Sequence, residues 1–436
     1  MKKLSTLLFI CLGFSSIAQE PCSTGRYSTD VYSNVTTTSN IVYGSNYSFS
    51  NAVVTLKLDF YEPQADTATK RPLIIWIHGG SFLGGSKTDG DMVTLSNRFA
   101  KKGYACASLD YRTGFFPIDS ANALKAVLRA VHDAKAAIRY FYKDAQTTNT
   151  YKIDTTNIFI GGSSAGAITA LHMAYLNRTC EITENESAYF TQAYLDQVGG
   201  AEGVSGNPCY STKVKGVINL AGALAKYYWL EAGDVPVVSC HGTNDGTVGY
   251  SRQIVNPGVP LMYLDGSRML HERAAAVGVD SRLYTFYGAD HVPHASNAQY
   301  MDTTVNFVRD FLIDQLGCSD APLQTANTPF GTANLYAFTP CTNNVPFNDC
   351  TALSASELDM ETFAIYPNPT SQSFTLETGS NMNNHVMIVD MNGRIVAQFV
   401  ANSSQTKVDV SNLNEGIYFV KIQNQFGNQT IKLIKE

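Results

Sequence analysis

The sequence predicts an α/β protein with a mostly parallel, doubly wound sheet, followed by a small all-β C-terminal domain. Over residues 51–317, short continuous apolar runs alternate with helical patterns, as expected of a sheet covered by helices on both faces. From residue 363 on, short alternating runs separated by turn signals replace this rhythm. A glycine- and serine-rich turn at residues 162–166 separates an apolar run from a helical pattern, which indicates a strand–turn–helix junction.

The strands of the larger region are expected where the chain is continuously apolar, because a parallel strand covered on both faces buries every side chain. Residues 73–77, with the sequence LIIWI, are the clearest example. Further strands are expected at residues 104–109, 157–160, 214–220, 235–239 and 283–287. A helix is expected over residues 119–143, where Leu124 and Val131 share a face, and a last helix is expected to end at Gly317.

The N-terminal segment predicts export. Residues 1–19 combine a positive start, an apolar core at residues 7–12 and a small-residue cleavage site at residues 16–18, as a secretory signal peptide does. No later stretch approaches the ~20 apolar residues of a membrane-spanning helix, so no membrane span is expected. Loss of the two lysines in the signal peptide takes the formal charge from −6 to −8. This acidity argues against a nucleic acid as partner.

Cysteine usage agrees with export. Eight of the nine cysteines lie beyond the signal peptide, where disulfides are possible. Cys106 and Cys240 lie in apolar runs and are expected to be buried thiols. Spacing leaves the connectivity open, and the pairs favoured by their polar loops are Cys180 with Cys209 and Cys341 with Cys350. The sequence has no Cys-x-x-Cys and no cluster of His and Cys, so no metal site is expected.

Composition divides the chain into successive segments. The larger domain is expected over residues 20–317. Within it, residues 178–212 are polar and rich in Asn, Glu, Gly and Tyr, and an insertion at this point of an α/β chain suits a lid or substrate-binding cap. Residues 318–362 are rich in Thr, Asn and Pro and are expected to form a linker or a disulfide-containing extension. Residues 363–436 are expected to form the separate all-β domain.

Several motifs of the C-terminal domain are shared with a known family. They are YPNP at residues 366–369, DMNGRIV at 390–396, LNEGIYFVKI at 413–422 and the closing IKLIKE. Together they resemble the C-terminal sorting domain of type IX secretion substrates. The resemblance implies the type IX secretion machinery as a partner, translocation across the outer membrane, and a location outside the cell or on its surface. A carbohydrate-binding β-sandwich is the alternative for this domain.

The most informative motif of the larger domain is GSSAG at residues 162–166. An apolar run, residues 157–160, precedes it, and a helical pattern, residues 167–176, follows it. A G-x-S-x-G pentapeptide in this setting is typical of a nucleophile elbow, a turn so tight that small residues must flank the serine. Ser164 is therefore the candidate nucleophile, with the N-terminus of the following helix behind its hydroxyl.

A serine nucleophile needs an anion hole, and candidate donors follow the first central strand. HGGSF at residues 78–82 comes directly after the run at 73–77. Glycine-rich backbone leaves N–H groups that can point at an oxyanion, so the expected donors are the amides of Gly80, Ser81 and Ala165. A plain glycine turn is the alternative interpretation.

The candidate acid and base follow the last two predicted strands. Asp245 lies in a glycine-flanked loop after residues 235–239, and Asp265 and Asp280 are weaker alternatives. His291 comes directly after the final strand, and His294 is its rival as the base. The order Ser…Asp…His along the chain is the one that an elbow serine requires.

Five motifs then occur in the order of a known superfamily: HGGSFLGGS, LDYR, IFIGGSSAGA, HGTNDGTV and GADHVPH. Over residues 51–317 they resemble the α/β-hydrolase superfamily, specifically its HGG-F carboxylesterase and hormone-sensitive-lipase-like branches. The resemblance implies the α/β-hydrolase fold, Ser164 as nucleophile, Asp245 as orienting acid and His291 as base. Ser81 departs from the family pattern, in which a third glycine is commonest, but only its backbone amide is required. Arg112, which ends the LDYR motif, is expected to be a scaffold residue.

The resulting prediction is a secreted serine carboxylesterase that works through an acyl-enzyme and needs no cofactor. Its expected substrates are small-acyl, aromatic or polysaccharide-linked esters such as acetyl or feruloyl esters, with polyesters as a further class. A prolyl-oligopeptidase-like peptidase and a non-catalytic surface protein are the alternatives. Several aromatic residues are candidates either for a substrate pocket or for core packing: Tyr189, Phe190, Tyr194, Tyr227, Tyr228 and Trp229.

Overall fold

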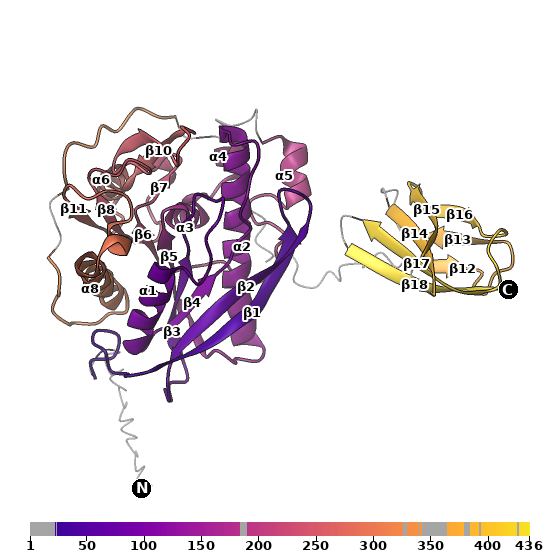
Figure 1. The fold of residues 1–436 in the computed structure, drawn as a ribbon, viewed down its shortest axis with the longest axis horizontal. Coiled ribbons are helices and arrows are strands. Elements are labelled where there is room, and N and C mark those ends of the chain that lie inside the picture. Colours follow the sequence, from indigo (N-terminus) through magenta and orange to yellow (C-terminus); the bar gives the residue numbers. More distant parts are fainter. Residues whose placement is uncertain are drawn as a thin grey trace, which may run out of the picture. The chain divides into compact units, whose positions relative to one another are not determined.

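The computed structural model describes residue 22 and residues 24–183, 190–325, 329–339, 341, 364–378, 384–391, 394–424 and 427–436. The chain forms two compact units, residues 1–349 and residues 350–436 (Figure 1). The predicted signal peptide lies outside the described residues, and so do residues 342–362 of the predicted extension. No helix in the described part of the chain is long and apolar enough to cross a membrane.

The larger unit is built on an eight-stranded sheet with the order β1-β2-β4-β3-β5-β6-β8-β11. These strands are β1 Val35–Tyr47, β2 Val53–Pro63, β3 Arg71–Ile77, β4 Ala105–Leu109, β5 Ile153–Ser163, β6 Gly216–Leu220, β8 Val237–Gly242 and β11 Ser281–Phe286. β2 is antiparallel to both of its neighbours, and every other neighbouring pair is parallel. The predicted mostly parallel sheet is confirmed. β1 and β2 were not predicted, because most side chains of β1 are exposed and polar residues interrupt the apolar positions of β2.

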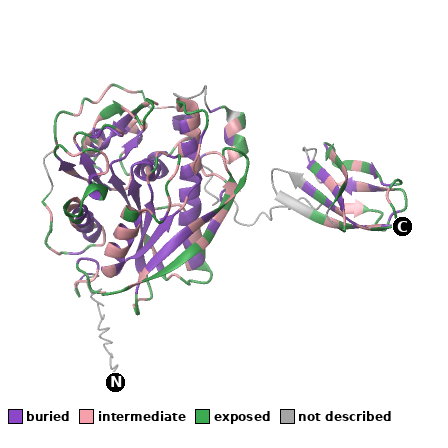
Figure 2. Ribbon diagram, in the orientation of Figure 1, coloured by how far each residue is buried: buried purple, intermediate pink, exposed green. Residues whose placement is uncertain are grey.

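Helices cover the two faces of this sheet (Figure 1). They are α1 Gly90–Lys101, α2 Ser120–Gln146, α3 Ala165–Tyr175, α6 Ser267–Val277 and α8 Ala298–Gln315. Side chains of β3 alternate between two core clusters: Ile75 and Ile77 pack with α2 and α3, whereas Ile74 and Trp76 pack with α1 and α8. This is the alternation that a strand buried on both faces imposes. Figure 2 shows the buried strands between the helices.

Shorter elements lie around the sheet. A second, three-stranded sheet has the order β7-β10-β9. The short elements are β7 Ala223–Leu224, β9 Arg252–Ile254, β10 Tyr263–Gly266, α4 Thr179–Thr183, α5 Gln192–Val198, α7 Pro293–Ser296 and the 3₁₀ turn η1 Tyr227–Trp229. α4 and α5 belong to the predicted insertion at residues 178–212.

The disulfides differ from the expected pairs. Cys22 is bonded to Cys318, and Cys180 is bonded to Cys341. The pairing of Cys180 with Cys209 is therefore wrong, since Cys209 is an exposed free thiol. The pairing of Cys341 with Cys350 is also wrong. The two bonds span 296 and 161 residues, so their partners are chosen by tertiary proximity, which local loop composition does not reveal.

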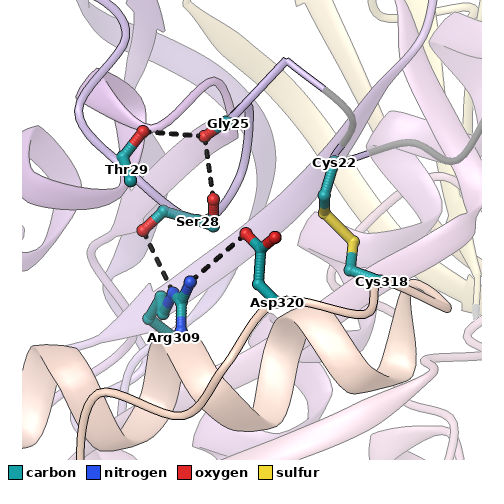
Figure 3. The surroundings of a disulfide bond; sticks show 7 residues. All are labelled: Cys22, Gly25, Ser28, Thr29, Arg309, Cys318 and Asp320. Atoms are coloured by element: carbon teal, nitrogen blue, oxygen red, sulfur yellow. Dashed lines mark hydrogen bonds and ion pairs between the residues drawn. A yellow bond between two sulfur atoms is a disulfide. The ribbon is translucent and has the colours of Figure 1, made fainter.

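Figure 3 shows how the Cys22–Cys318 bond joins the start of the described chain to the segment after α8. Beside it, Arg309 of α8 donates to the carbonyl of Ser28 at 3.1 Å and contacts the carboxylate of Asp320 at 3.3 Å. The bond is thus embedded in polar contacts between the same two segments. The other predicted thiols, Cys106 and Cys240, are free and buried, as expected.

The segment that follows Cys318 packs against the larger unit. Tyr336 Oη donates to Asp265 Oδ2 at 2.6 Å, and the ring of Phe338 stacks on that of Tyr228 with centroids 4.4 Å apart. The backbone amide of Phe330 donates to Tyr250 Oη at 3.1 Å. The described part of this segment therefore covers η1 and the small sheet, and we call residues 329–339 and 341 the strap.

The smaller unit is all-β, as predicted. One sheet has the order β12-β13-β16 and the other β15-β14-β17-β18. The strands are β12 Ala364–Tyr366, β13 Ser373–Glu377, β14 Asn384–Asp390, β15 Ile395–Ala401, β16 Gln405–Asp409, β17 Gly416–Asn424 and β18 Gly427–Lys435. Phe374, Ile388 and Val420 belong to its core.

Candidate active site

Ser164 lies in the turn between β5 and α3. Its backbone angles are φ 54° and ψ −116°, a region that costs a non-glycine residue on the order of 1–3 kcal/mol. The amide of Ser164 donates to the carbonyl of Leu220 on β6 at 2.9 Å. The turn is therefore held in a strained conformation by the neighbouring strand, and such strain is typical of functional sites.

The two glycines of the turn are required by close backbone contact. A Cβ on Gly162 would lie 2.4 Å from the carbonyl oxygen of Ile77, and a Cβ on Gly166 would lie 1.9 Å from the same atom. Both distances are far inside van der Waals contact, so neither position accepts a side chain. The spacing of the GSSAG motif thus follows from the packing of α3 against the end of β3.

Three of the predicted residues meet at the carboxyl end of the sheet. His291 Nε2 lies 2.7 Å from Ser164 Oγ, and His291 Nδ1 lies 2.7 Å from Asp245 Oδ2. Ser164 follows β5, His291 follows β11 and Asp245 follows β8, and parallel strands bring their carboxyl ends to one edge of a sheet. The distances suit a serine hydroxyl that donates to Nε2 while Nδ1–H donates to the carboxylate.

Both oxygens of the Asp245 carboxylate have hydrogen-bond partners. Its Oδ1 accepts the amides of Thr247 at 2.9 Å and Val248 at 2.8 Å, and its Oδ2 also lies 3.2 Å from Nε2 of His241. Burial by itself raises the pKa of Asp245, but hydrogen bonds from His241 and His291 outweigh it and hold the pKa well below its ordinary value. Asp245 is therefore a carboxylate across the neutral pH range.

The alternative acids lie elsewhere. Asp265 pairs with Arg252 at 2.7 Å and accepts from Tyr336, while Asp280 accepts from Gln315 at 2.9 Å. Neither carboxylate is bonded to His291. Each has a structural partner of its own in the described structure.

His294, the rival base, is bonded to the serine before the nucleophile. Its Nε2 lies 2.7 Å from Ser163 Oγ and 3.4 Å from Asp91 Oδ2. His294 and Ser163 are both buried. We did not predict the Ser163–His294–Asp91 cluster, although the doubled serine and the two histidines three residues apart were visible signals for it. The cluster ties α1 and the loop that carries His291 to the elbow.

The turn after β3, which carries two of the predicted anion-hole donors, has an unusual backbone conformation. Gly80, Ser81 and Phe82 have φ of 103°, 57° and 60°. The carbonyl of Gly80 accepts the amides of Leu83 and Gly84, at 2.9 and 3.1 Å. A Cβ on Gly80 would lie 2.3 Å from the carbonyl oxygen of Gly84. This close approach is the reason for glycine at position 80.

The predicted donors are not used for folding in the described structure. No turn or loop hydrogen bond of the described backbone uses the amide of Gly80 or Ser81. Ala165 is the first residue of α3, so its amide has no intrahelical acceptor. Ser81, Ser164 and Ala165 line one cavity, so these groups surround a common space.

Two cavities of different character meet at Ser164. The first, about 280 Å³, is apolar and is lined by side chains of α2 and α3, such as Leu124, Val127 and Ile168. The second, about 440 Å³, is polar and is lined by Asp89, Asp91 and His291 among others. Ser164 and Ser81 line both cavities.

The aromatic candidates divide between pocket and core. Phe190 and Trp229 line the apolar cavity. Tyr227 and Tyr228 pack against Tyr336 and Phe338 of the strap instead. The remaining two are Tyr194, which contacts Phe190, and Tyr189, which lies outside the described residues.

Arg112 is bonded only to scaffold groups in the described structure. It pairs with the buried carboxylate of Asp133 at 2.7 Å and donates to Ser205 Oγ at 3.0 Å and to the carbonyl of Tyr47 at 2.9 Å. These contacts join β1, α2 and the segment after α5. This agrees with the scaffold role expected for the arginine of the LDYR motif.

Family models match a part of each unit. Residues 58–202 match the BD-FAE family, a family of α/β-hydrolase esterases, and residues 364–436 match the secretion system C-terminal sorting domain. The chain is an esterase-like α/β-hydrolase with a secretion sorting tail. The match at 58–202 includes Gly80, Ser81, Ser164 and Ala165, whereas Asp245 and His291 follow it. The sorting tail indicates type IX secretion to the cell surface or the extracellular space, as predicted.

Solved structures of one bacterial enzyme are similar to this esterase-like chain. The apo form of Thermogutta terrifontis esterase 2 has 21% sequence identity and a TM-score of 0.48, and the alignment covers 65% of this chain and 96% of that chain. The same enzyme phosphorylated by paraoxon has 22% identity and a TM-score of 0.47, with 64% and 94% covered. Its propionate-bound form has 21% identity and a TM-score of 0.46, with 63% and 93% covered. No curated protein matches the chain.

Proposed function

We propose that the protein is a secreted serine carboxylic-ester hydrolase that works through an acyl-enzyme. The observation that carries the proposal is the continuous chain of contacts from Asp245 through His291 to Ser164, with 2.7 Å between each pair of bonded atoms. Such a chain makes an otherwise weak hydroxyl nucleophilic at neutral pH.

In the first step, His291 Nε2 takes the proton of Ser164 while Ser164 Oγ forms a bond to the acyl carbon of the ester. The amides of Gly80, Ser81 and Ala165 stabilise the negative charge on the carbonyl oxygen. His291 then gives its proton to the leaving oxygen, so the alcohol departs and the acyl group remains on Ser164. Asp245 stabilises the imidazolium that forms between these two events.

In the second step, water replaces the alcohol. His291 takes a proton from the water as its oxygen bonds to the acyl carbon, and the same amides stabilise the second oxyanion. Collapse of this intermediate breaks the bond to Ser164 Oγ, which regains a proton from His291. The products are a carboxylic acid and the free enzyme. Asp245 remains ionised throughout, because its pKa is held well below neutrality.

The two cavities beside Ser164 support a division of the ester between them. The apolar cavity suits the acyl group, because burial of apolar surface is its main source of binding energy. The polar cavity suits a hydroxyl-bearing alcohol, which hydrogen-bonds to carboxylates such as those of Asp89 and Asp91. Among the predicted substrates, this favours acyl groups larger than acetyl on a polar alcohol such as a sugar.

Covalent trapping tests the nucleophile directly. A fluorophosphonate should add once to the purified chain, abolish hydrolysis of p-nitrophenyl butanoate, and label the peptide that contains Ser164. Ser164→Ala should lose both labelling and hydrolysis. Ser163→Ala, which removes the neighbouring hydroxyl, should still take up the label. Labelling that persists in Ser164→Ala would contradict the proposal.

A further inference from the structure

The apolar cavity follows one face of helix α3. Ser164, Ile168, His172 and Leu176 line it at intervals of four residues, and residues spaced in this way lie on the same side of a helix. Ser164 and Leu176 are the two caps of this helix, whose 11 residues place the caps roughly 18 Å apart at 1.5 Å per residue. The cavity therefore reaches from the nucleophile to the far end of the helix, well beyond the length of an acetyl group.

Glu181 of α4 lies at that far end. Its Oε2 accepts the amides of Asn177 at 2.8 Å and Arg178 at 2.9 Å, the two residues that follow the end of α3. The side chain lines the cavity, although the residue is only 4% exposed. Within the described structure, the other oxygen, Oε1, forms no hydrogen bond. One carboxyl oxygen is thus held by the backbone, and the other is left for a molecule in the cavity.

The position of Glu181 is fixed by its neighbours in the chain. The adjacent Cys180 is bonded to Cys341 at the end of the strap. The strap in turn contacts β10 through the bond between Tyr336 and Asp265. A group that is held in place before binding loses little entropy when it forms a new hydrogen bond.

We propose that Glu181 recognises a hydroxyl group at the far end of a long, otherwise apolar acyl chain that is transferred to Ser164. This rests on the proposed esterase function. It makes Glu181 a specificity-determining residue at the opposite end of the cavity from the chemistry.

The chemistry of a buried carboxyl group favours a hydroxyl partner. Burial raises the pKa of Glu181 to about 7, against hydrogen bonds from the amides of Arg178 and Asn177 that lower it. Both the acid and the carboxylate are therefore populated near neutral pH. A hydroxyl accepts a hydrogen bond from the acid and donates one to the carboxylate, whereas a methyl end leaves a buried oxygen unsatisfied in both states.

Three groups that the structure describes near Glu181 have other partners or are neutral. Arg178 pairs with Glu231, and Asp234 accepts from Asn177 at 3.2 Å. On α3, burial lowers the pKa of His172 to about 4, so its ring is neutral near pH 7.

Two cations also line the cavity. Arg252 pairs with Asp265 at 2.7 Å. Lys226 is the second cation among the lining residues. Neither cation lies on α3 or α4.

A matched series of p-nitrophenyl esters tests the proposal with the full-length chain. Straight acyl chains from four to sixteen carbons are compared with the same chains that carry a terminal hydroxyl. An extended chain gains roughly 1.2 Å per bond, a third of an extended residue, so roughly 15 bonds span the cavity. The hydroxyl should raise kcat/KM about tenfold or more near that length. For chains too short to reach Glu181, the terminal hydroxyl should leave kcat/KM unchanged or lower it.

The pH dependence supplies a readout that a merely structural role would not alter. The ratio of kcat/KM for the methyl-ended tetradecanoate to that for the butanoate cancels any pH dependence of the chemical steps, because both substrates use the same triad. In the wild type this ratio should fall as pH rises through about 7, since Glu181 becomes charged against an apolar chain. In Glu181→Gln, which keeps an oxygen for the two amides, the ratio should not change with pH. Glu272→Gln removes an exposed carboxylate of α6 and should behave as the wild type.

The outcomes separate the two proposals. If the butanoate ester is not hydrolysed, the esterase function fails. If it is hydrolysed but the hydroxyl gives no advantage at any chain length, only the role of Glu181 is overturned. The role is also overturned if Glu181→Gln keeps the pH dependence of the wild type. The chain-length comparison in the wild type needs no variant, so poor folding of Glu181→Gln would not leave the proposal untested.

Discussion

Replacement of Asp245 by asparagine should disable the base without disturbing the site. The amides of Thr247 and Val248 both donate to Oδ1 of Asp245, so they require an oxygen at that position. In Asp245→Asn the carboxamide oxygen must occupy it, which leaves the NH₂ group where Oδ2 was. That NH₂ donates to His291 Nδ1, and the ring proton is displaced to Nε2. His291 then points an N–H at Ser164 and cannot accept the proton of its hydroxyl.

The size of the effect follows from the loss of the correct tautomer. In serine triads this change lowers kcat by about 10⁴, which corresponds to about 5.4 kcal/mol of transition-state stabilisation. The loss should appear in kcat rather than in KM, because Asp245 does not line the cavities described above. The fold should persist, since the two amide contacts remain.

The assay is steady-state hydrolysis of p-nitrophenyl butanoate at pH 7.5, with thermal unfolding as a check on folding. Asp280→Asn is the matched control, because in the described structure the carboxylate of Asp280 is hydrogen-bonded only to Gln315, and this variant should retain wild-type kcat. If Asp245→Asn kept more than a tenth of wild-type kcat while folded, the assignment of Asp245 as the orienting acid would be refuted.

Three further predictions concern the base, the tail and the disulfides. His291→Ala should lower kcat about 10⁴-fold, and His294→Ala should lower it much less, because His294 contacts Ser163 and not Ser164; equal losses in kcat would contradict this. A chain that ends near residue 362 should keep kcat and KM for the butanoate, since the site lies within residues 1–349; an inactive but folded truncation would show that the tail contributes to catalysis. Replacing Cys22 and Cys318 together by serine should lower the free energy of unfolding by about 5 kcal/mol, because the bond closes a loop of 296 residues in the unfolded chain; urea unfolding measures this, and an unchanged midpoint would contradict it.

The central strands could be predicted from the sequence because a strand that is buried on both faces forms a continuous apolar run. β3 is apolar at nearly every position, and its five last residues, 73–77, were recognised from that run alone. β1 was missed, because its exposed face makes the pattern polar. An edge strand forms because it pairs with its neighbour, and its own composition indicates little about that pairing.

Contacts between side chains of distant segments could not be predicted from the sequence. The Cys22–Cys318 and Cys180–Cys341 bonds depend on which loops approach in the folded chain, and the predicted local pairs were wrong for that reason. In the sequence, Glu181 is one polar residue of a polar insertion. Only the course of the cavity along α3 shows that Glu181 and Ser164 lie at its two ends.

The sequence by itself determined the fold class and the candidates for each chemical role, because tight turns demand glycine and parallel strands demand apolar runs. It also placed those candidates after strands whose carboxyl ends meet at one edge. Only the tertiary structure distinguishes His291 from His294, because both follow the same strand but His291 Nε2 lies 2.7 Å from Ser164 Oγ, whereas His294 Nε2 lies 2.7 Å from Ser163 Oγ. It likewise brings Asp245, rather than Asp265 or Asp280, into contact with His291, and it shapes the apolar cavity. Those outcomes depend on distances across the fold, which a linear pattern does not contain.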